Sequence, residues 1–268
     1  MPKVNVERRG TVLEIVLNRP EVLNAVDRET IAVLAAAAGE AAEDRTARAV
    51  LLRGAGTHFC AGGDIGMFAA LIGLPPVDRR NMLYRIVGEL HPLLVRLRHM
   101  PKPVVAAVQG AAAGFGLSLV LAADLALAAE DAVFTCGYIH LGTTPDGGMT
   151  ATLPGVVGLK LAAELALLGE RFDARRALAL GLVNRVTAPD QLIGEAQTLA
   201  ARLADGPTEA YARTKALIQA SLGDAFEAQL RREAENFAAC AATDDFVEGV
   251  RAFLEKRRPS FTGEGRGL

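Results

Sequence analysis

The sequence predicts an α/β fold, because hydrophobic segments typical of β-strands alternate along the chain with Ala- and Leu-rich segments typical of helices. Short apolar or alternating runs predict strands at 11–20 (TVLEIVLNRP), 47–54 (ARAVLLRG) and 104–110 (VVAAVQG). Segments rich in helix-forming residues predict helices at 28–44 and 80–100. Strands and helices that alternate in this way are expected to form a largely parallel sheet covered by helices.

The remainder of the chain divides into two further parts. The helix at 80–100 is expected to end at Pro101 and Pro103, because proline lacks the N–H group that a helix interior needs. The segment 111–136 is interpreted as a turn, a helix, a strand, a second turn and a second strand. Beyond about Leu192 the strand pattern stops and the segments are helical. We therefore expect a core formed by residues 1–191 and a helical C-terminal part formed by residues 192–268.

The composition argues against several classes of protein. With 268 residues, 51% of them hydrophobic, the chain can bury a sizeable core. Its formal net charge of −2 gives no electrostatic reason to expect a nucleic acid or a membrane surface as a partner. The segment MPKVNVERRG lacks the apolar stretch of a signal peptide, and no apolar run suggests a transmembrane helix. Cys60, Cys136 and Cys240 are far apart, so we expect neither disulfides nor a CxxC zinc site, and a reducing cytoplasm is the expected location.

Two glycine-rich segments follow predicted strands. Gly62 and Gly63 lie in HFCAGGDIGMF, and two adjacent glycines suggest that the backbone approaches another group closely. The second segment, GAAAGFGLSLVL, opens a helix, and the amides of Gly114, Phe115 and Gly116 would lie at the positive end of its dipole. It is not a dinucleotide-binding or Walker loop, since the third glycine and the lysine are missing. Each segment alone is compatible with simple turn chemistry, but together they favour a shared site for an anion.

Six segments carry a resemblance to a known family: LNRPEVLNA (17–25), HFCAGGDIGMF (58–68), PKPVVAAVQGAAAGFGLSLVLAAD (101–124), LGTTPDGG (141–148), ARRALALGLVNRV (174–186) and EGVRAFLEKRRPSFTG (248–263). In their order and spacing, over nearly the whole chain, they resemble the enoyl-CoA hydratase/isomerase (crotonase) superfamily. The resemblance implies a spiral of ββα repeats, with the acyl-CoA site in residues 1–191. It also implies that residues 192–268 pack against neighbouring subunits in a homotrimer or a dimer of trimers.

The resemblance implies that the backbone amides of Gly63 and Phe115 bind the thioester oxygen of an acyl-CoA. Fixed amides in a dry site stabilise the charge of a thioester enolate without reorganisation, and each can contribute roughly 10²–10³ in rate. Because the contact comes from the backbone, a phenylalanine is tolerated at position 115.

Three residues are candidates for acid/base chemistry. The two glutamates that family hydratases use to activate water correspond to Ser118 and Tyr138, and neither side chain is a carboxylate base near neutral pH. Asp146 corresponds to the position of a catalytic carboxylate in other branches, which include enoyl-CoA isomerases. One carboxylate can move a proton between two carbons across an enolate, so it suits isomerisation better than hydration. The alternative is that Pro145, Asp146 and Gly147 form an ordinary solvated turn.

His91 corresponds to a histidine that works with the equivalent aspartate in the dehalogenase branch of the family. A lone histidine among leucines on a helix is more often a packed or surface residue. That branch also has a tryptophan where Tyr138 stands, and this chain has no tryptophan, so dehalogenation is not favoured.

The resemblance also suggests where coenzyme A binds. The residues concerned are Val22, Leu23, Ala61, Gly62, Gly63, Asp64, Ile65, Gly114, Phe253 and Lys256. Asp64 is expected mainly to cap the short helix that follows it, and the Lys256 region is also compatible with a solvated helix end. His58 and His140 lack the spacing of metal ligands, so no metal is expected. Coenzyme A would be part of the substrate, and no separate cofactor is expected.

The resulting hypothesis is a cytoplasmic acyl-CoA enzyme that acts through a thioester enolate, favouring an enoyl-CoA isomerase. One alternative is a hydratase-like lyase of fatty-acid or aromatic acyl-CoA metabolism. Another is a catalytically silent acyl-CoA-binding subunit, which would keep both glycine-rich loops. The segment 68–90 is mostly apolar and predicts an apolar acyl group.

Overall fold

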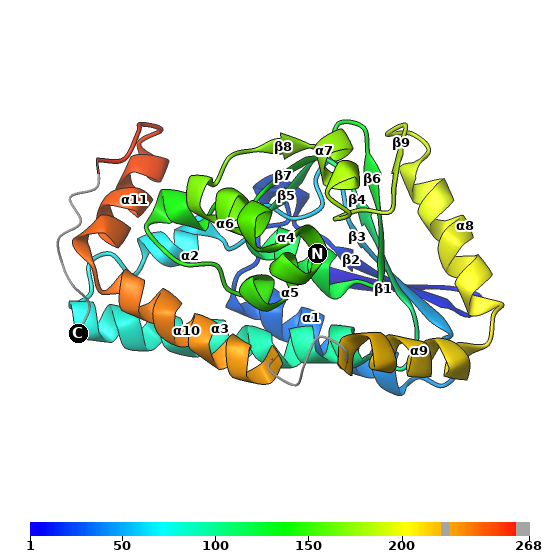
Figure 1. Ribbon diagram of the computed structural model, residues 1–268. Coiled ribbons are helices and arrows are strands. Elements are labelled where there is room, and N and C mark those ends of the chain that lie inside the picture. Colours follow the sequence, from blue (N-terminus) through cyan, green and yellow to red (C-terminus); the bar gives the residue numbers. More distant parts are fainter. Residues whose placement is uncertain (221–225, 261–268) are drawn as a thin grey trace.

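The computed structural model describes residues 1–220 and 226–260, and it is built around a six-stranded sheet (Figure 1). Only the β1–β2 pair is antiparallel; the other strand pairs of this sheet are parallel. The strands, in their order across the sheet, are β1 (Val4–Arg9), β2 (Val12–Leu17), β3 (Ala49–Gly54), β4 (Val104–Val108), β6 (Leu125–Ala129) and β9 (Arg185–Thr187). The predicted α/β class is therefore confirmed.

The central strands are apolar because helices cover both faces of the sheet. In β3, Val50 and Leu52 belong to the core formed with α1 (Arg28–Glu43) and α3 (Pro76–His99). The alternating residues Ala49 and Leu51 belong to a second core formed with α8 (Leu192–Ala204). Both faces are buried, as is usual for parallel strands.

A smaller three-stranded sheet lies beside the first one and leads into the second glycine-rich loop. Its strands, in order, are β5 (Ala111–Ala113), β7 (Val133–Thr135) and β8 (Phe172–Asp173). The helices associated with this region are α4 (Phe115–Ala122), η2 (Tyr138–Leu141), α5 (Met149–Val157), α6 (Leu159–Leu168) and α7 (Ala174–Ala179). The first glycine-rich loop is joined to this sheet, because Cys60 pairs with Ala112.

Residues after Thr187 form only helices in the described part of the chain. Besides α8, these are α9 (Thr208–Ala220), α10 (Phe226–Ala241) and α11 (Asp244–Leu254). Helix α10 runs alongside α3, and α11 packs against η2 and the short helix α2 (Ile65–Ala69) (Figure 1). Helices α10 and α11 thus cover the end of the molecule where the glycine-rich loops meet, whereas α8 packs on the face of the large sheet (Figure 1). A short 3₁₀ helix, η1 (Pro20–Val22), completes the elements.

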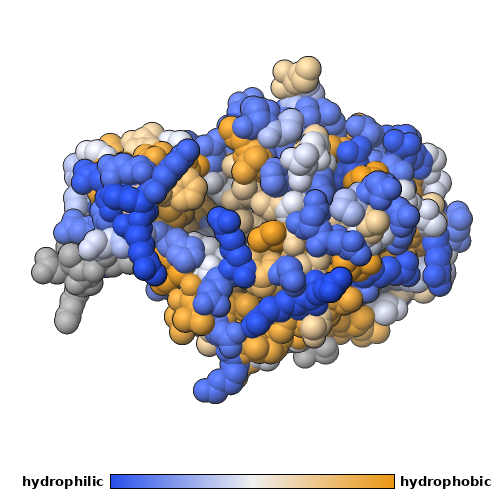
Figure 2. Space-filling model, turned by 90° about the horizontal axis from the view of Figure 1, so that it is seen from above, coloured by the Kyte–Doolittle hydropathy of each residue, from blue (hydrophilic) through white to orange (hydrophobic). Residues whose placement is uncertain are grey.

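The face of the molecule seen from above carries mainly hydrophilic side chains (Figure 2). Figure 2 shows hydrophilic side chains over most of one face, with hydrophobic side chains gathered in smaller patches between and below them. Within residues 1–220 and 226–260, no helix is both long and apolar enough to span a membrane.

Candidate active site

A cavity of about 1020 Å³ lies between the two glycine-rich loops and the helices that cover them. Its lining includes the loop of residues 61–65 and most of the segment 110–115. Helices α2, α3, α10 and α11 contribute mainly apolar side chains. A largely apolar cavity with a few polar groups is typical of a small-molecule site.

Backbone hydrogen bonds tie the two glycine-rich loops to each other. Cys60 N donates to Ala111 O at 2.9 Å, and Ala113 N donates to Cys60 O at 3.0 Å. On the other side, Val26 N donates to Gly62 O at 2.8 Å. The first loop is therefore fixed between the chain at residue 26 and strand β5. These bonds limit how far the two glycine-rich loops can move relative to each other.

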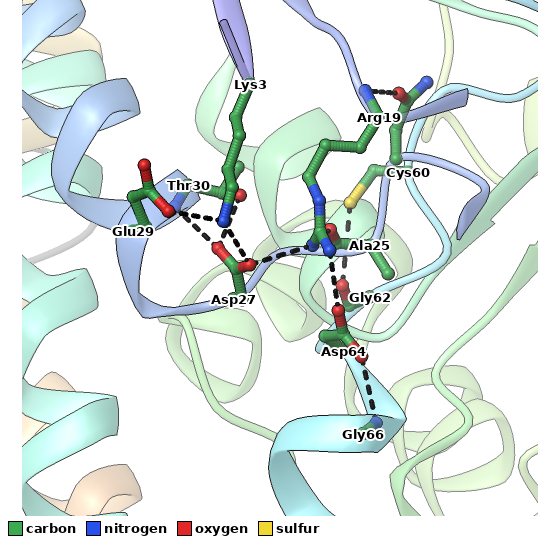
Figure 3. A network of polar contacts seen from close by, with 11 residues as sticks. Lys3, Arg19, Ala25, Asp27, Glu29, Thr30, Cys60, Gly62, Asp64 and Gly66 are labelled. Atoms are coloured by element: carbon green, nitrogen blue, oxygen red, sulfur yellow. Dashed lines mark hydrogen bonds and ion pairs between the residues drawn. The ribbon is translucent and has the colours of Figure 1, made fainter. Parts of the chain in front are cut away.

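Side-chain contacts of Arg19 and Asp64 also fix this loop, as Figure 3 shows. Arg19 donates to Ala25 O at 2.7 Å and to Asp64 Oδ2 at 3.0 Å. The other oxygen of Asp64 accepts from Gly66 N at 2.9 Å and caps α2. Asp27 Oδ2 lies 3.4 Å from Nη1 of the same arginine. Asp64 thus lines the cavity, but its carboxylate is engaged in holding the loop and the helix.

The backbone amides of Gly63 and Phe115, two residues that line the cavity, are among those that have no acceptor in the described part of the chain. Phe115 is the first residue of α4, where a helix leaves its amides unpaired. The two loops approach each other closely at Gly62, which precedes Gly63. A Cβ atom at Gly62 would lie 3.7 Å from Phe115 N and 3.0 Å from Ala113 O. Two free N–H groups from neighbouring loops can bind one anionic oxygen.

Asp146 faces the same cavity from the segment between η2 and α5. Its side chain is buried, and Oδ1 accepts a 2.7 Å hydrogen bond from the Tyr138 hydroxyl. Burial raises the pKa of Asp146 to about 6, although the Tyr138 hydrogen bond acts in the opposite direction. Burial and the neighbouring Asp146 raise the pKa of Tyr138 well above its usual value, so this hydroxyl remains a donor.

The turn that carries Asp146 packs closely on α4. Ser118 Oγ, from α4, donates to Asp146 O at 3.1 Å. A Cβ atom at Gly147 would lie 2.8 Å from Ser118 Cβ, and Gly147 also has a φ of 65°. Gly148 has a φ of 75°. The two glycines therefore permit a backbone path that a larger residue would obstruct.

The cavity brings together most of the residues expected to form the site. The expected residues in its lining are Val22, Leu23, Ala61, Gly62, Gly63, Asp64, Ile65, Gly114, Phe115, Tyr138, Asp146 and Phe253. Ser118 is buried behind the cavity wall, where it contacts the Asp146 backbone. Lys256 is exposed and lies outside the lining, whereas its neighbour Arg257 lines the cavity and donates to Glu248 at 2.8 Å.

The structure does not bring His91 to Asp146. The imidazole lies outside the cavity lining and near the backbone of Leu230 in α10, and no hydrogen bond joins it to Asp146. Its partly buried position lowers its pKa, and Nε2 has no partner among the described residues. The reason is the orientation of α3, which presents Leu90 and Val87 to the cavity.

His58 and His140 both line the cavity, but neither belongs to a metal site in the structure. The described residues contain no group of three or more His, Cys, Asp or Glu side chains that could hold a metal ion. His58 Nδ1 accepts from Ala111 N at 3.0 Å, which ties the histidine to the second loop.

Three residues at the site were not identified from the sequence: Phe237, Glu233 and Arg257. Phe237 lines the cavity with its ring centroid 6.0 Å from that of Phe68, and Tyr138 meets Phe237 edge to face at 6.4 Å. Arg257 lines the cavity, whereas Lys256 was the expected contact. Glu233 is buried on α10 and bonds to the segment after Asp146. The amphipathic pattern of the C-terminal helices does not show what these residues contact.

Together, these groups can bind an anionic oxygen and transfer a proton near it. Two unpaired amides can hold a negatively charged oxygen, and a buried carboxyl group that titrates near neutral pH can exchange a proton with a carbon close to that oxygen. The lining of the cavity is mainly aromatic and aliphatic, so an apolar group bound between them would displace water from the reacting atoms.

The chain belongs to the enoyl-CoA hydratase/isomerase family, whose sequence profile matches residues 7–264. It is 40% identical to a probable enoyl-CoA hydratase from Rhodobacter capsulatus, over 93% of each chain. It is 38% identical to the 1,2-epoxyphenylacetyl-CoA isomerase of Escherichia coli, over 94% of this chain and 95% of that one. A crystal structure of an enoyl-CoA hydratase from Mycobacterium avium subsp. paratuberculosis superposes with a TM-score of 0.88 at 36% identity, covering 97% of this chain and 99% of that chain. The crotonase fold and the family suggested by the sequence are thus confirmed.

Proposed function

We propose that this protein is an enoyl-CoA isomerase that shifts a carbon–carbon double bond through a thioester enolate. The observation that carries the proposal is Asp146, a buried carboxyl group with a pKa of about 6 that lines the same cavity as Gly63 and Phe115. A base that titrates near neutral pH is well matched to both accepting and returning a proton.

In the proposed reaction, the Asp146 carboxylate removes a proton from the α-carbon of a 3-enoyl-CoA. The electron pair of the broken C–H bond moves into the conjugated system, and the negative charge on the thioester oxygen is stabilised by the amides of Gly63 and Phe115. Protonated Asp146 then returns the proton to the γ-carbon, and the double bond moves between the α- and β-carbons. Atoms and charge balance without a metal or a further cofactor.

Hydration is the second candidate, because a relative 40% identical to this chain is named a probable enoyl-CoA hydratase. Besides Asp146, the carboxylates that line the cavity are those of Asp64 and Asp131. The carboxylate of Asp64 is held by Arg19 and Gly66, and Asp131 is exposed to solvent. Hydration that relies on two acidic groups at the reacting carbons therefore has less support than a proton shift by one.

The substrate is proposed to carry an apolar acyl group that contacts the aromatic side chains of Phe68 and Phe237. The relative named for epoxyphenylacetyl-CoA supports including aromatic acyl groups among the substrates to be tested. We also propose that the protein forms a homotrimer or a dimer of trimers, as the family resemblance implies. Light scattering during size-exclusion chromatography measures this mass directly.

The test of the proposed function is an NMR measurement in heavy water with a panel of straight-chain and aryl-substituted 2- and 3-enoyl-CoAs. We expect the wild type to exchange protons at the α- and γ-carbons and to interconvert the double-bond isomers. Asp146→Asn should lose both activities by at least about 10² while it still binds coenzyme A. Asp190→Asn, an exposed change of the same kind, is the control.

The possible outcomes of this test distinguish an isomerase from a hydratase and from a silent binding subunit. Formation of a 3-hydroxyacyl-CoA in place of double-bond migration would identify a hydratase. Binding of coenzyme A without exchange on any substrate would overturn the isomerase proposal and favour a silent binding subunit. Full activity of Asp146→Asn would remove Asp146 from the mechanism.

A further inference from the structure

Glu233 holds the segment that carries Asp146 from the opposite side of the cavity wall. The carboxylate lies on α10 and is 3% exposed. Oε2 accepts from Gly148 N at 2.6 Å. Oε1 accepts from Thr150 N at 3.1 Å and from Thr150 Oγ1 at 2.5 Å. Both carboxylate oxygens are therefore used, and all of these bonds go to the first residues of one helix.

These bonds replace a cap that the local sequence does not supply. Helix α5 begins at Met149, and its N-cap residue is Gly148, which has no side chain to accept a bond. The unpaired amides of a helix start need an acceptor. Glu233 supplies one from a helix more than 80 residues away in the sequence, so the position of α10 determines where α5 begins.

The start of α5 is directly connected to Asp146. Gly148 follows Asp146 by two residues, and Met149 N donates to Asp146 O at 3.2 Å. Gly147 and Gly148 both have positive φ angles and do not restrict the direction of the turn as larger residues would. Because the glycines themselves leave the path of this turn open, that path depends on the hydrogen bonds at its ends, and Glu233 accepts those at Gly148 and Thr150.

The opposite side of Asp146 is held as well. Ser118 bonds to its backbone carbonyl, and Tyr138 bonds to its carboxylate. Burial raises the pKa of Glu233 to about 7, and the nearby charge of Asp146 also raises it, so the two carboxyl groups are electrostatically coupled. The cluster is thus a network that holds one carboxyl group at the cavity and a second one behind it.

We propose that Glu233 is a positioning residue for Asp146: by accepting hydrogen bonds from Gly148 and Thr150 it holds the turn that directs the Asp146 carboxylate toward the bound acyl group. This inference rests on the proposed function of Asp146 as the proton-transferring group. A displacement of a catalytic group by about 1 Å can reduce a rate by up to about 10². Loss of the Glu233 bonds is therefore expected to reduce kcat and to leave coenzyme A binding intact.

The main experiment compares Glu233→Gln with Glu235→Gln, an exposed change on the same helix. Double-bond migration is measured per binding site, with sites counted by titration with coenzyme A. We expect Glu233→Gln to lower kcat about tenfold, with KM and the Kd of coenzyme A changed by less than about twofold. Glu235→Gln should match the wild type.

A double-mutant cycle distinguishes positioning from a general effect on folding. If Glu233 acts through Asp146, Glu233→Gln should cause no further loss of the residual exchange rate of Asp146→Asn. An equal loss in both backgrounds would overturn the proposal, as would an unchanged kcat in Glu233→Gln. If the wild type shows no proton exchange at all, the proposed function itself fails; if Asp146→Asn alone loses activity, only the positioning role fails.

A second pair of variants covers the case in which Glu233→Gln does not fold. Thr150 is exposed and its hydroxyl donates to Glu233. Thr150→Val removes this donor and should lower kcat about threefold with KM unchanged, whereas Thr150→Ser keeps the hydroxyl and should restore kcat. Equal kcat values for the two variants would contradict the proposal.

Discussion

The Tyr138 hydroxyl donates a 2.7 Å hydrogen bond to Oδ1 of Asp146, and both side chains are buried at the cavity. Burial favours the neutral carboxyl group, whereas the hydrogen bond favours the carboxylate. Burial is the larger effect, and the pKa of Asp146 is raised to about 6. The Tyr138 hydroxyl therefore acts on the pKa and the orientation of the Asp146 carboxyl group.

Tyr138→Phe is expected to raise the pKa of Asp146 further. The variant keeps the ring that packs edge to face on Phe237 but loses the hydroxyl that stabilises the carboxylate. The acidic limb of the pH–rate profile should therefore move to higher pH. The measurement is the rate of α-proton exchange against pH, with the exposed Tyr84→Phe as the control. An unmoved profile in Tyr138→Phe would show that the hydrogen bond does not affect the reactive carboxyl group.

The wild-type reaction should slow in acid, because only the ionised form of Asp146 can accept a proton. With a pKa of about 6, log kcat/KM should be flat above about pH 7 and fall with a slope of one below about pH 6. The measurement is the steady-state rate of double-bond migration across this pH range, with protein stability checked at each pH. A constant rate down to about pH 4.5 would show that the base does not have a pKa near 6, which contradicts a raised pKa of Asp146 in the reacting enzyme.

Much of the core was predictable from the sequence because it depends on local patterns. Strands β2, β3 and β4 have long apolar runs, and helices α1 and α3 have the composition of helices. Strand β1 has a single buried residue, and β5, β8 and β9 span only two or three residues. Such short segments carry too little periodicity to be recognised, because their pairing partners determine their conformation.

The site was predictable to the extent that backbone chemistry defines it. The two glycine-rich loops and Asp146 stand in short, distinctive motifs, and they line one cavity. Glu233 and Phe237 reach the site only because α10 packs along α3, which is a long-range contact that no local pattern reports. The direction in which His91 faces likewise depends on how α3 is rotated in the structure.

Asp146→Asn should make the protein more stable at neutral and alkaline pH. The folded-state pKa of Asp146 is about 6 and the unfolded value is 3.8, so between these values the native state binds more protons than the unfolded state. Stability is therefore lost as the pH rises from about 4 to about 6, by roughly 3 kcal/mol in total. Asparagine has no such titration and can still accept the Tyr138 hydrogen bond.

The test is the difference in free energy of unfolding between Asp146→Asn and the wild type, measured by urea denaturation at several pH values. The variant should gain up to about 3 kcal/mol near pH 8, and the gain should shrink toward zero near pH 4. Because all other groups titrate in both proteins, they largely cancel in the difference. A difference that does not change with pH would contradict the raised pKa.

Gly62→Ala should separate the two amides that face the cavity. Gly62 has a φ of 100°, and a Cβ atom there would lie 3.0 Å from Ala113 O and 3.7 Å from Phe115 N. Alanine therefore forces the first loop away from the second, and Gly63 N moves with it. We expect the rate of proton exchange to fall by about 10², as for the loss of one oxyanion-binding donor, and stability to fall by about 1–3 kcal/mol. Gly73→Ala is the matched control, since Gly73 has no positive φ and no atom within 4 Å of its Cβ position. If Gly62→Ala and Gly73→Ala show the same exchange rate, the distance between the two loops does not control the reaction, and the amides of Gly63 and Phe115 do not act as a pair.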